Sequence, residues 1–368
     1  MTLTRRQAIR SGVGAGIAFA SALRDGGRLS AQAQPPAPVA IPQTTPPPGD
    51  PRFPKVPTWK TEFRKLAPNV YAYNQGGGPG QVAQGVSNAG VIVGDDHVMV
   101  IDATGAPMHA KAFMAAIRQA EPNKPFRRLI NTHHHGDHVN GNQFFGNIEI
   151  ISHPYCRDEV VKAIPATPGK WEKRDGWADG TEDRKLVPPT TTVDGNFAYH
   201  YGDTVAEVQF VGPAHTYGDL MVYIPKYKIL FASDVAFFHV APFAHNAHVG
   251  KWLSVCDRIQ KMDVDVIVPG HGPIATKKEL AEMAGYFRLL QAEVKTRRAA
   301  GMTPGRAAAD IKLGKYDNWI GPERIVMNTV RLFNEFSGTG GPGYDTAGTA
   351  RATQEYNAIL ASRSGPAK

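Results

Sequence analysis

The segment NTHHHGDHVNGN at residues 131–142 places four histidines and one aspartate within the six positions from 133 to 138. The whole chain of 368 residues contains only 13 histidines. A neutral imidazole needs one donor and one acceptor partner, so crowding several in one loop is costly unless a cation organises them. Imidazole nitrogens and carboxylate oxygens are also ligands that zinc takes in proteins. The segment therefore predicts a metal site.

The spacing within this segment suits two ions rather than one. His133 and His135 are two residues apart, so their side chains point to the same side of an extended chain. Asp137 and His138 follow Gly136, which allows the chain to turn. One loop can thus offer one pair of ligands to one ion and the other pair to a second ion nearby. Each half-site needs at least one more ligand from elsewhere.

Three further segments supply such residues, each at the end of a predicted strand. VGPAHTYGD presents His215, ILFASDVAF presents Asp234, and VIVPGHGP presents His271. Ligands commonly bind at the strand ends of α/β folds. One histidine on an apolar element is more often a packed core residue than a ligand. Recurrence of metal-competent residues at several strand ends favours a shared metal centre.

These motifs resemble those of the metallo-β-lactamase superfamily of binuclear hydrolases. The resemblance rests on His-x-His-x-Asp-His, H-T-x-G-D, an aspartate after an apolar strand and P-G-H-G-P, and covers roughly residues 65–300. It implies an αββα sandwich of two mixed sheets with outer helices, and two Zn²⁺ ions per chain at one edge. The implied ligands are His133, His135 and His215 for site one, Asp137, His138 and His271 for site two, and Asp234 bridging both ions.

The resemblance also implies how the site would work. A hydroxide held between the two ions would attack the substrate, and Asp137 would orient this hydroxide and carry its proton. Asp102 in VIDATG and Asp219 in HTYGD are candidates to accept a hydrogen bond from the free N–H of a ligand imidazole. A turn or capping role fits each of these two aspartates equally well. His134 lies between two ligands, so it should point away and serve the structure.

The rest of the chain alternates short apolar β-rich runs with helical stretches, as expected for an α/β fold. The predicted strands are 69–73, 88–94, 97–103, 127–131, 148–152, 207–212, 220–225, 228–234 and 264–268. Helices are predicted at 108–120, from about 155, at 249–262, after a capping box of Thr276 and Glu279, and from Pro304 and Pro322. These elements predict one α/β domain over 59–336, which the resemblance implies to be a hydrolase of the metallo-β-lactamase fold.

The N-terminus resembles a twin-arginine export signal. TRRQAIR places two adjacent arginines before an apolar, glycine-rich run, and Ala31-x-Ala33 is a cleavage pattern. Residues 1–33 are therefore expected to be removed, which predicts a periplasmic or secreted protein without a membrane anchor. Residues 34–58 are proline-rich and are expected to form an extended linker or surface arm.

Several other segments carry weaker predictions. Residues 165–205 are polar and are expected to form a surface loop, and 337–368 is glycine-rich at its start and is expected to be a flexible tail. Residues 235–248 combine aromatic residues with histidines and are candidates to wall a substrate pocket, with a plain packing role equally open. The histidines of this last segment are His239, His245 and His248.

The distribution of charge and the cysteine content indicate which classes of partner to expect. Five arginines and one aspartate within residues 1–33 account for half of the formal net charge of +8, and the remainder is spread thinly. Without a basic stripe, nucleic acid is not an expected partner. Cys156 and Cys256 form no CxxC pair and are expected to be buried thiols. A small-molecule substrate is expected, and the sequence leaves the oligomeric state open.

The bridging aspartate bears on the reaction, because fold alone does not define function. By resemblance, β-lactamases typically have cysteine or no ligand at the Asp234 position, whereas lactonases and many esterase-like members have aspartate. Export disfavours cytosolic thioesterases and RNA-processing members, and sulfatase-like members usually have acidic residues in the third ligand segment. The favoured function is therefore hydrolysis of a lactone, carboxylic ester or amide of a small, moderately hydrophobic or aromatic molecule. The alternative within this class is a β-lactamase-type amide hydrolase.

Two alternatives from other classes stay open. A mononuclear iron oxygenase on the same scaffold would use two histidines and a carboxylate and leave the second site without a role. A zinc-binding periplasmic module without catalysis would have no need of the bridging carboxylate. Both full sets of ligands in this sequence favour the hydrolase.

Overall fold

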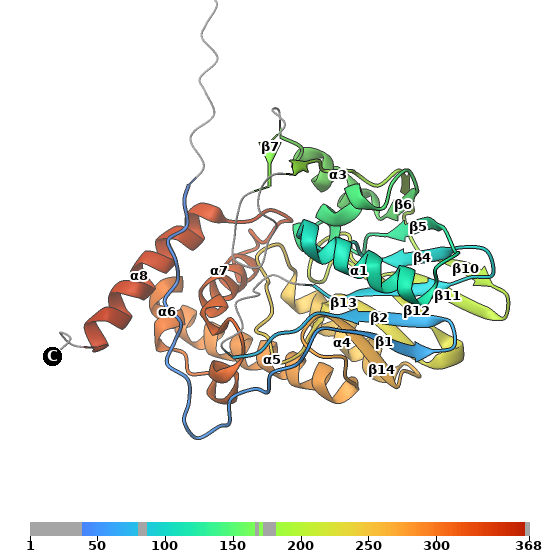
Figure 1. Ribbon diagram of the computed structural model, residues 1–368. Coiled ribbons are helices and arrows are strands. Elements are labelled where there is room, and N and C mark those ends of the chain that lie inside the picture. The colour runs from blue at the N-terminus through green and yellow to red at the C-terminus, as the bar shows by residue number, and fades with distance from the viewer. Residues whose placement is uncertain (1–38, 80–86, 166–168, 172–181, 365–368) are drawn as a thin grey trace, which may run out of the picture. The chain divides into compact units, whose positions relative to one another are not determined.

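The computed structural model of this chain describes residues 39–79, 87–165, 169–171 and 182–364. The predicted export signal at 1–33 and the start of the predicted linker at 34–38 lie outside the described residues. The described part is built from two large β-sheets with helices on their outer faces (Figure 1).

The first sheet has seven strands and forms the N-terminal half of the fold. In spatial order they are β1 (Glu62–Ala67), β2 (Val70–Asn74), β3 (Ala89–Val93), β4 (Val98–Ile101), β5 (Phe126–Ile130), β6 (Glu149–Ser152) and β9 (Thr191–Thr192). Neighbours from β1 to β4 are antiparallel, and those from β4 to β9 are parallel. Parallel neighbours need a crossover, which α1 (Pro107–Ala120) provides between β4 and β5.

The second sheet has five strands and carries two of the predicted ligand segments. In order they are β10 (Phe197–Tyr201), β11 (Thr204–Phe210), β12 (Leu220–Ile224), β13 (Ile229–Phe237) and β14 (Val266–His271). The strands β10 to β13 are antiparallel, whereas β13 and β14 are parallel and joined through α4 (Val249–Lys261). β13 is buried at every position, so both of its faces are covered.

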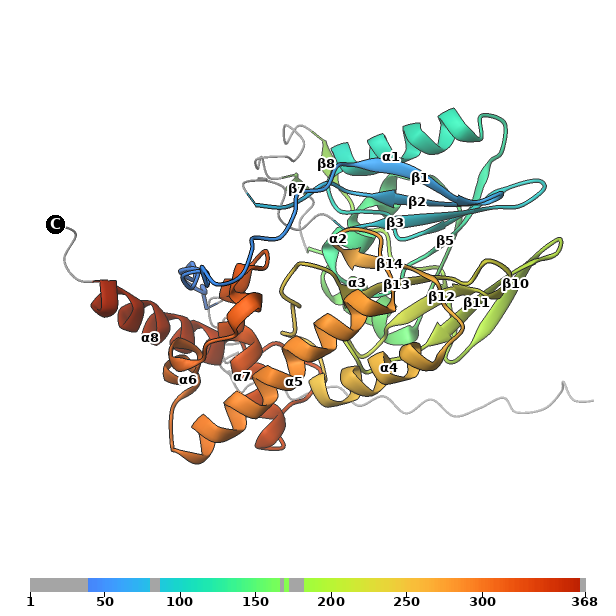
Figure 2. The same cartoon turned by 90° about the horizontal axis from the view of Figure 1, so that it is seen from below.

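The sheets and helices form layers because each buries its apolar face against a neighbouring element. Figure 2 shows the two sheets stacked, with α1 on the outer face of the first and α4 and α5 (Lys277–Ala299) on the outer face of the second. Ile92 and Phe231 belong to the core between the sheets, Phe113 of α1 to the core outside the first, and Trp252 of α4 to the core outside the second. The predicted αββα sandwich of two mixed sheets is confirmed.

The helices that follow the second sheet begin as the sequence predicts. Thr276 and Glu279 form the predicted capping box at α5. Thr303 accepts a hydrogen bond from the backbone N–H of Arg306 at the start of α6 (Pro304–Asp310). The remaining helices and 3₁₀ turns are α2 (Gly136–Val139), η1 (Asn140–Phe144), α3 (Pro154–Lys162), η2 (Pro225–Tyr227), η3 (Gly314–Asn318), η4 (Pro322–Arg324), α7 (Ile325–Phe336) and α8 (Thr346–Ser364).

The prediction of a flexible tail over 337–368 is wrong for most of its described part. Residues 346–364 form α8, which packs against α6 and α7. Its buried positions include Ala350, Ala352 and Tyr356. Small side chains let helices approach closely, but they add little apolar periodicity to a sequence, which is why the helix was not predicted.

The prediction of a surface loop over 165–205 is also only partly right. Of the described residues, 169–170 and 183–184 form the short antiparallel pair of β7 (Gly169–Lys170) and β8 (Asp183–Arg184). Residues 197–201 form β10, in which the aromatic positions are more buried than the exposed Ala198 and His200 between them. This alternation is typical of a strand at the edge of a sheet.

The described part of the proline-rich arm, 39–58, has no strand or helix of its own. Side chains from the C-terminal half hold it instead. Asn318 donates from its amide to the carbonyls of Asp50 (2.8 Å) and Phe53 (2.7 Å), and Asn357 donates to the carbonyl of Gln43 (2.8 Å). The arm has no core of its own. Side-chain amides of the C-terminal half bond to its backbone carbonyls and hold it on the surface of the described unit.

Within the described ranges, no helix is both long and apolar enough to span a lipid bilayer. Cys156 and Cys256 are buried and unpaired with each other, as predicted. Burial raises the pKa of the Cys256 thiol to about 12, so this thiol is protonated at neutral pH and is unsuited to bind metal.

Candidate metal centre

The histidine-rich loop follows β5 directly. Thr132 is held by its backbone N–H, which donates to Asp102 at the end of β4 (2.8 Å). His135 has an extended backbone and is the residue before α2, whereas Asp137 and His138 lie within the single turn of α2. This change of backbone aims the two halves of the motif at different points, as the spacing predicts.

The other predicted ligands reach the same place from the second sheet. His215 lies in the connection between β11 and β12, and His271 is the last residue of β14. Asp234 lies inside β13, next to Ser233, which has a positive φ of 46° and marks an irregular register against β14. Such an irregularity redirects one side chain of a strand, and here it is Asp234 that reaches the cluster.

Close approach of the P-G-H-G-P turn explains two of its glycines. A Cβ on Gly270 would collide with the carboxylate and would lie 2.7 Å from the backbone nitrogen of Asp234. Gly272 has a φ of +98°, which favours glycine. Asn88 secures the same turn, because its side-chain amide donates to the carbonyls of Pro269 (3.0 Å) and Gly272 (2.8 Å). The turn therefore fits against Asp234 because Gly270 lacks a side chain, and a Cβ on Gly272 would collide with the backbone of Phe238.

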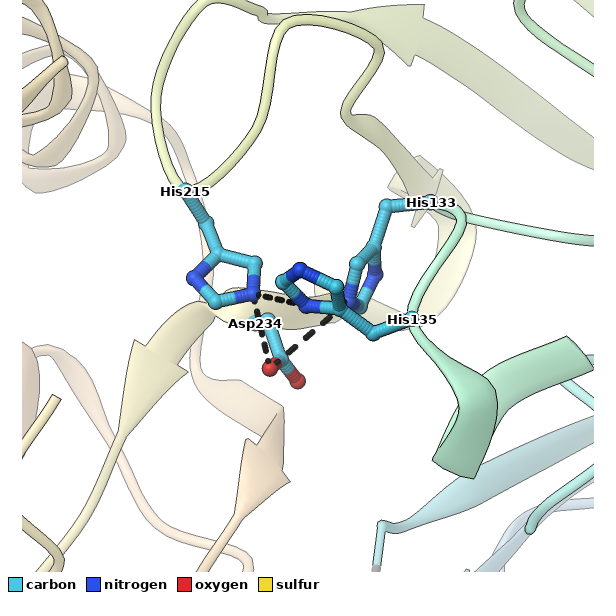
Figure 3. A group of neighbouring side chains, drawn as sticks. All are labelled: His133, His135, His215 and Asp234. Carbon is cyan, nitrogen blue, oxygen red and sulfur yellow. Dashed lines mark hydrogen bonds and ion pairs between the residues drawn. The ribbon is translucent and has the colours of Figure 1, made fainter. Parts of the chain in front are cut away.

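Site one converges as predicted. Figure 3 shows the rings of His133, His135 and His215 directed toward the carboxylate of Asp234. His135 Nδ1 lies 3.1 Å from His133 Nε2 and 2.8 Å from His215 Nε2, and His215 Nε2 lies 3.1 Å from Asp234 Oδ2. Ligand atoms bound at about 2.1 Å around a tetrahedral ion would lie about 3.4 Å apart, so this set fits a zinc-sized cation after small adjustments.

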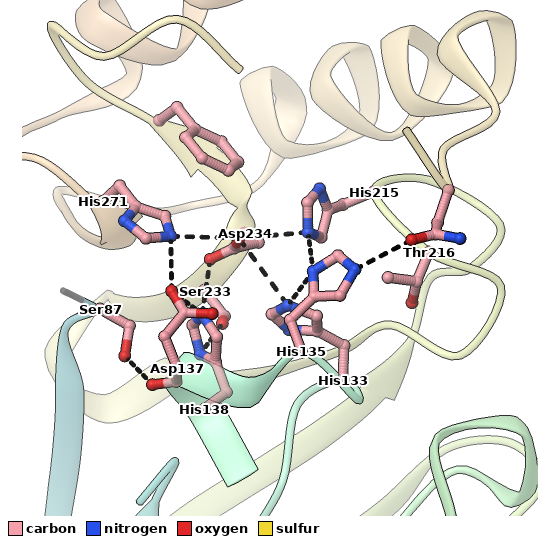
Figure 4. Close-up of polar contacts among 12 residues, drawn as sticks. Ser87, His133, His135, Asp137, His138, His215, Thr216, Ser233, Asp234 and His271 are labelled. Carbon is pink, nitrogen blue, oxygen red and sulfur yellow. Dashed lines mark hydrogen bonds and ion pairs between the residues drawn. The ribbon is translucent and has the colours of Figure 1, made fainter. Parts of the chain in front are cut away.

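Site two lies next to it and shares Asp234. His271 Nε2 lies 3.2 Å from Asp137 Oδ2, and His138 Nε2 lies 3.7 Å from the same oxygen. Asp234 Oδ1 lies 3.0 Å from His138 Nε2, and its Oδ2 lies 3.3 Å from His271 Nε2 (Figure 4). The structure thus brings all seven predicted side chains together, in two groups that one carboxylate joins.

The electrostatics of the two groups differ. Burial, and the neighbouring histidines, hold the pKa of His133 and of His135 well below the ordinary value. Burial opposes the ionised form of Asp234, but the surrounding histidines outweigh it and hold the pKa of Asp234 well below the ordinary value. His133 and His135 are therefore neutral imidazoles beside an ionised carboxylate, which is the protonation state that metal binding requires.

The two aspartates proposed to support ligand imidazoles behave differently. Asp102 Oδ2 lies 2.8 Å from His138 Nδ1, so this expectation is confirmed. The expectation for Asp219 is wrong. Its carboxylate accepts hydrogen bonds from the backbone N–H (2.8 Å) and hydroxyl (2.5 Å) of Thr216 and closes a local turn. His215 Nδ1 has no hydrogen-bond partner among the described residues.

The histidines outside the predicted ligand set have other surroundings. His134 lies against Tyr155, with ring centroids 5.6 Å apart, and burial lowers the pKa of His134 to about 4. Among the three histidines of the 235–248 segment, His245 is the one whose ring stacks on a predicted ligand, with its centroid 4.8 Å from that of His135. His248 accepts a hydrogen bond at the start of α4, and His239 faces a hollow lined by Phe53 and Trp319.

Sequence reasoning missed several residues that hold the ligands. Thr132 and Ser233 donate their hydroxyls to Asp102 at 2.8 Å and 3.0 Å, and the Ser87 hydroxyl donates to the backbone carbonyl of Asp137. Serine and threonine are frequent in all segments, so these residue types alone do not indicate a role at the site. The one indication for Thr132 and Ser233 is that they precede the predicted ligands His133 and Asp234 in the sequence. Asn246 had no such signal.

Asn246 sets the orientation of His135. Its Oδ1 lies 3.2 Å from His135 Nε2, and its Nδ2 donates to the carbonyl of Pro342 at 3.2 Å. The amide oxygen therefore accepts the Nε2 proton and leaves the Nδ1 lone pair of His135 facing site one. We expect Asn246→Ala to weaken metal binding at site one by about 10- to 100-fold, measured by competition with a chromophoric chelator.

Asn357→Ala is the matched control for this substitution, because Asn357 also uses its amide for two hydrogen bonds, both to the arm at residues 43–45. Its metal affinity should equal that of the wild type. Equal affinity in Asn246→Ala would contradict the assigned role of the amide.

The pH dependence of the free energy of unfolding of the metal-free protein should reveal the charge on His271 in site two. Burial disfavours charge on His271, but Asp234 and Asp137 outweigh burial and raise the pKa of His271 to about 9. A histidine whose pKa is higher in the folded than in the unfolded state stabilises the fold fully below about pH 6.5, and this contribution is lost as pH rises through the folded pKa. We expect the free energy of unfolding to fall between about pH 6.5 and 9, by up to roughly 1.4 kcal/mol per pH unit.

Denaturant unfolding in the presence of a chelator at several pH values measures this decline. Metal ligands must be deprotonated, so the metal-loaded protein should lack the decline. A flat profile for the metal-free protein would contradict the charged state assigned to His271.

The sandwich fold and the histidine–aspartate cluster at its strand ends define a metal-binding α/β protein. The sequence model of the Metallo-beta-lactamase superfamily matches residues 82–271, and this chain belongs to that superfamily. Membership and the cluster together support a divalent-metal-dependent hydrolase at this broad level.

Curated relatives with different activities share part of the chain. The α subunit of a 2,4-dinitroanisole O-demethylase from Nocardioides sp. (strain JS1661) is 24% identical over 197 residues, which is 52% of this chain and 54% of that protein. A linear primary-alkylsulfatase from Pseudomonas sp. (strain ATCC 19151) is 22% identical over 265 residues, which is 61% of this chain and 49% of that protein. The chain thus spans about half the length of these relatives.

Among solved structures, the stereoselective inverting sec-alkylsulfatase Pisa1 from Pseudomonas sp. superposes with a TM-score of 0.56 at 16% identity. The match covers 76% of this chain and 50% of that chain. At this identity the likeness concerns the fold.

Proposed function

We propose that this protein is a binuclear metal hydrolase, with zinc as the expected ion, that cleaves a lactone, carboxylic ester or amide bond of a small molecule. The observation that carries the proposal is the position of Asp234, whose two oxygens lie 3.0–3.3 Å from histidines of both ligand groups. A carboxylate shared in this way serves two ions better than one.

The residues divide the work as follows. His133, His135 and His215 would hold one ion, Asp137, His138 and His271 the other, and Asp234 both. When bound, such ions supply Lewis acidity and a water whose pKa is near neutral. Asp137 has a side chain 21% exposed, compared with 4% for Asp234, so Asp137 is the carboxylate with access to a reacting water and its proton.

An aromatic side chain near the centre supports a substrate with an apolar part. Phe243 is half-buried and lies edge-on to His245 at 4.3 Å, and His245 stacks on the predicted ligand His135. Such rings bury apolar groups while polar ligands orient the reacting bond.

A mononuclear iron oxygenase remains the alternative from another class. It would leave one of the two ligand groups unused, and the close packing of both groups around Asp234 favours the hydrolase. The alkylsulfatase relatives make sulfate esters a second candidate substrate, although the third ligand segment of this chain lacks the acidic residues expected of sulfatases.

A hydrolysis panel tests the proposal. It contains an acyl-homoserine lactone, an aryl ester, an aryl amide or carbamate, a phosphotriester, a β-lactam and an alkyl sulfate, each with zinc-loaded protein and with chelator. We expect turnover of a lactone, ester or amide that chelator abolishes. Turnover that persists in chelator, or turnover of the alkyl sulfate alone, would contradict the proposal.

We also propose that the protein is exported by the twin-arginine route and cleaved after Ala33, so that it works in the periplasm or outside the cell. The support is the motif at residues 4–33 alone. Changing Arg5 and Arg6 together to lysine should retain the precursor inside cells, as measured by the mass and location of the expressed chain. Unchanged export of the double variant would contradict the proposal.

A further inference from the structure

Arg324 lies within electrostatic reach of the candidate metal centre, although no motif marks it. It ends η4, immediately before α7, and follows Gly321, whose φ is +69°. The same segment is fixed to the 235–248 segment by two backbone hydrogen bonds, from Ile320 N to the carbonyl of His239 (3.0 Å) and from Ala241 N to the carbonyl of Ile320 (2.8 Å). The segment that precedes α7 is therefore held against the 235–248 segment.

The guanidinium of Arg324 is connected to site one through aromatic contacts. Its Nη1 donates to the carbonyl of Ala241 at 2.6 Å, and its central carbon lies 5.2 Å from the ring centre of Phe243. Phe243 lies against His245, which in turn stacks on His135. A planar guanidinium on an aromatic face is oriented as well as charged.

Most of the hydrogen-bonding capacity of Arg324 is unused by the protein. Across the described ranges, the guanidinium of Arg324 makes no second hydrogen bond and has no carboxylate within ion-pair distance. The neighbouring Arg331 differs, because its Nη1 donates to the carbonyl of Gly341 (2.8 Å) and its Nε lies 3.5 Å from Glu335. A partly buried guanidinium without a counter-ion is costly, so a ligand that supplies one would bind favourably.

The metal-centre carboxylates are within electrostatic reach of this arginine. Burial lowers the pKa of Arg324, and the negative charges of Glu323, Asp234 and Asp137 partly offset that effect. Bound cations would neutralise the last two, which leaves the positive charge of Arg324 free to act on a substrate.

We propose that Arg324 binds an oxyanion group of the substrate, so that the substrate is a small anionic molecule with a carboxylate or sulfate beside its reacting bond. This inference rests on the proposed function, since it assigns the substrate class of the same site. Arginine recognises both oxyanions through paired N–H donors, and lysine reproduces the charge but not the paired geometry.

Calorimetric titration of the metal-loaded protein tests the proposal without turnover. The probes are hexanoate, hexyl sulfate and neutral 1-hexanol, and the variants are Arg324→Gln, Arg324→Lys and the exposed control Arg306→Gln. We expect Arg324→Gln to weaken binding of at least one anion by about 10- to 100-fold and to leave 1-hexanol unchanged. Arg324→Lys should be intermediate, and Arg306→Gln should equal the wild type.

The two anionic probes, hexanoate and hexyl sulfate, distinguish which oxyanion Arg324 binds. A loss confined to hexanoate assigns a carboxylate, and a loss confined to hexyl sulfate assigns a sulfate. Equal anion binding by wild type and Arg324→Gln, or absence of anion binding by the wild type, would overturn the inference. If Arg324→Gln does not fold, the same comparison with Arg324→Lys decides. These results are independent of the hydrolysis panel, so failure of the inference and failure of the proposed function can be told apart.

Discussion

Asp234→Ala is expected to reduce hydrolysis by more than about a thousandfold while the circular dichroism spectrum stays that of the wild type. Its oxygens lie 3.0 Å from His138 and 3.1 Å from His215, and they are the only ones among the described residues that join the two ligand groups. Without this carboxylate, buried imidazoles face one another with no anion between them. Loss of one preorganised electrostatic group already costs about 10²- to 10³-fold, and a shared ligand should cost more.

Asp158→Ala is the matched control, because Asp158 is an exposed aspartate of α3 away from the ligand segments. Steady-state rates of both variants, measured at saturating zinc on the best substrate of the panel, decide the matter. Hydrolysis by Asp234→Ala within tenfold of the wild type would refute the bridging role.

Asp102→Ala is expected to have the largest effect on stability, a loss of about 3 to 5 kcal/mol in the free energy of unfolding. The carboxylate is 1% exposed and accepts hydrogen bonds from the backbone N–H and the hydroxyl of Thr132, the hydroxyl of Ser233 and the ring of His138. Its removal leaves these buried donors without an acceptor. Asp102 also has a φ of +60°, a conformation that alanine adopts less readily than aspartate.

Asp102→Asn separates the two contributions of this side chain. The amide keeps one acceptor for the backbone N–H of Thr132, so the loss of stability should be smaller, about 1 to 2 kcal/mol. Its NH₂ group cannot accept the proton of His138 Nδ1, so metal affinity at site two should still fall. Urea unfolding and zinc titration measure the two effects, and wild-type stability of Asp102→Ala would contradict the assigned network.

The fold and the seven predicted ligands could be inferred from sequence because their signals are strong and local. Each strand is a short apolar run bounded by turn residues, and His215, Asp234 and His271 each stand out as metal-competent groups at the end of such a run. The structure brings them to the histidine-rich loop, although they are separated from it by some 80 to 140 positions in sequence.

The features that the sequence did not predict depend on contacts between residues that are far apart in the sequence. Asp102 and Asp219 look alike in sequence, because each is an aspartate beside an apolar strand. Only the fold reveals that one meets His138 and the other closes a turn on Thr216. The helix at 346–364 was missed because small residues form its buried side, and Arg324 was missed because a single arginine before a helix has no distinctive pattern.

The metal content of the purified wild-type protein tests the central claim most directly. After loading with excess zinc and removal of unbound ions, mass spectrometry of the metals should find about two ions per chain. Two ions are expected because each ligand group is complete on its own and Asp234 adds to both. A stoichiometry near zero, or a single tightly bound iron per chain, would contradict the binuclear hydrolase.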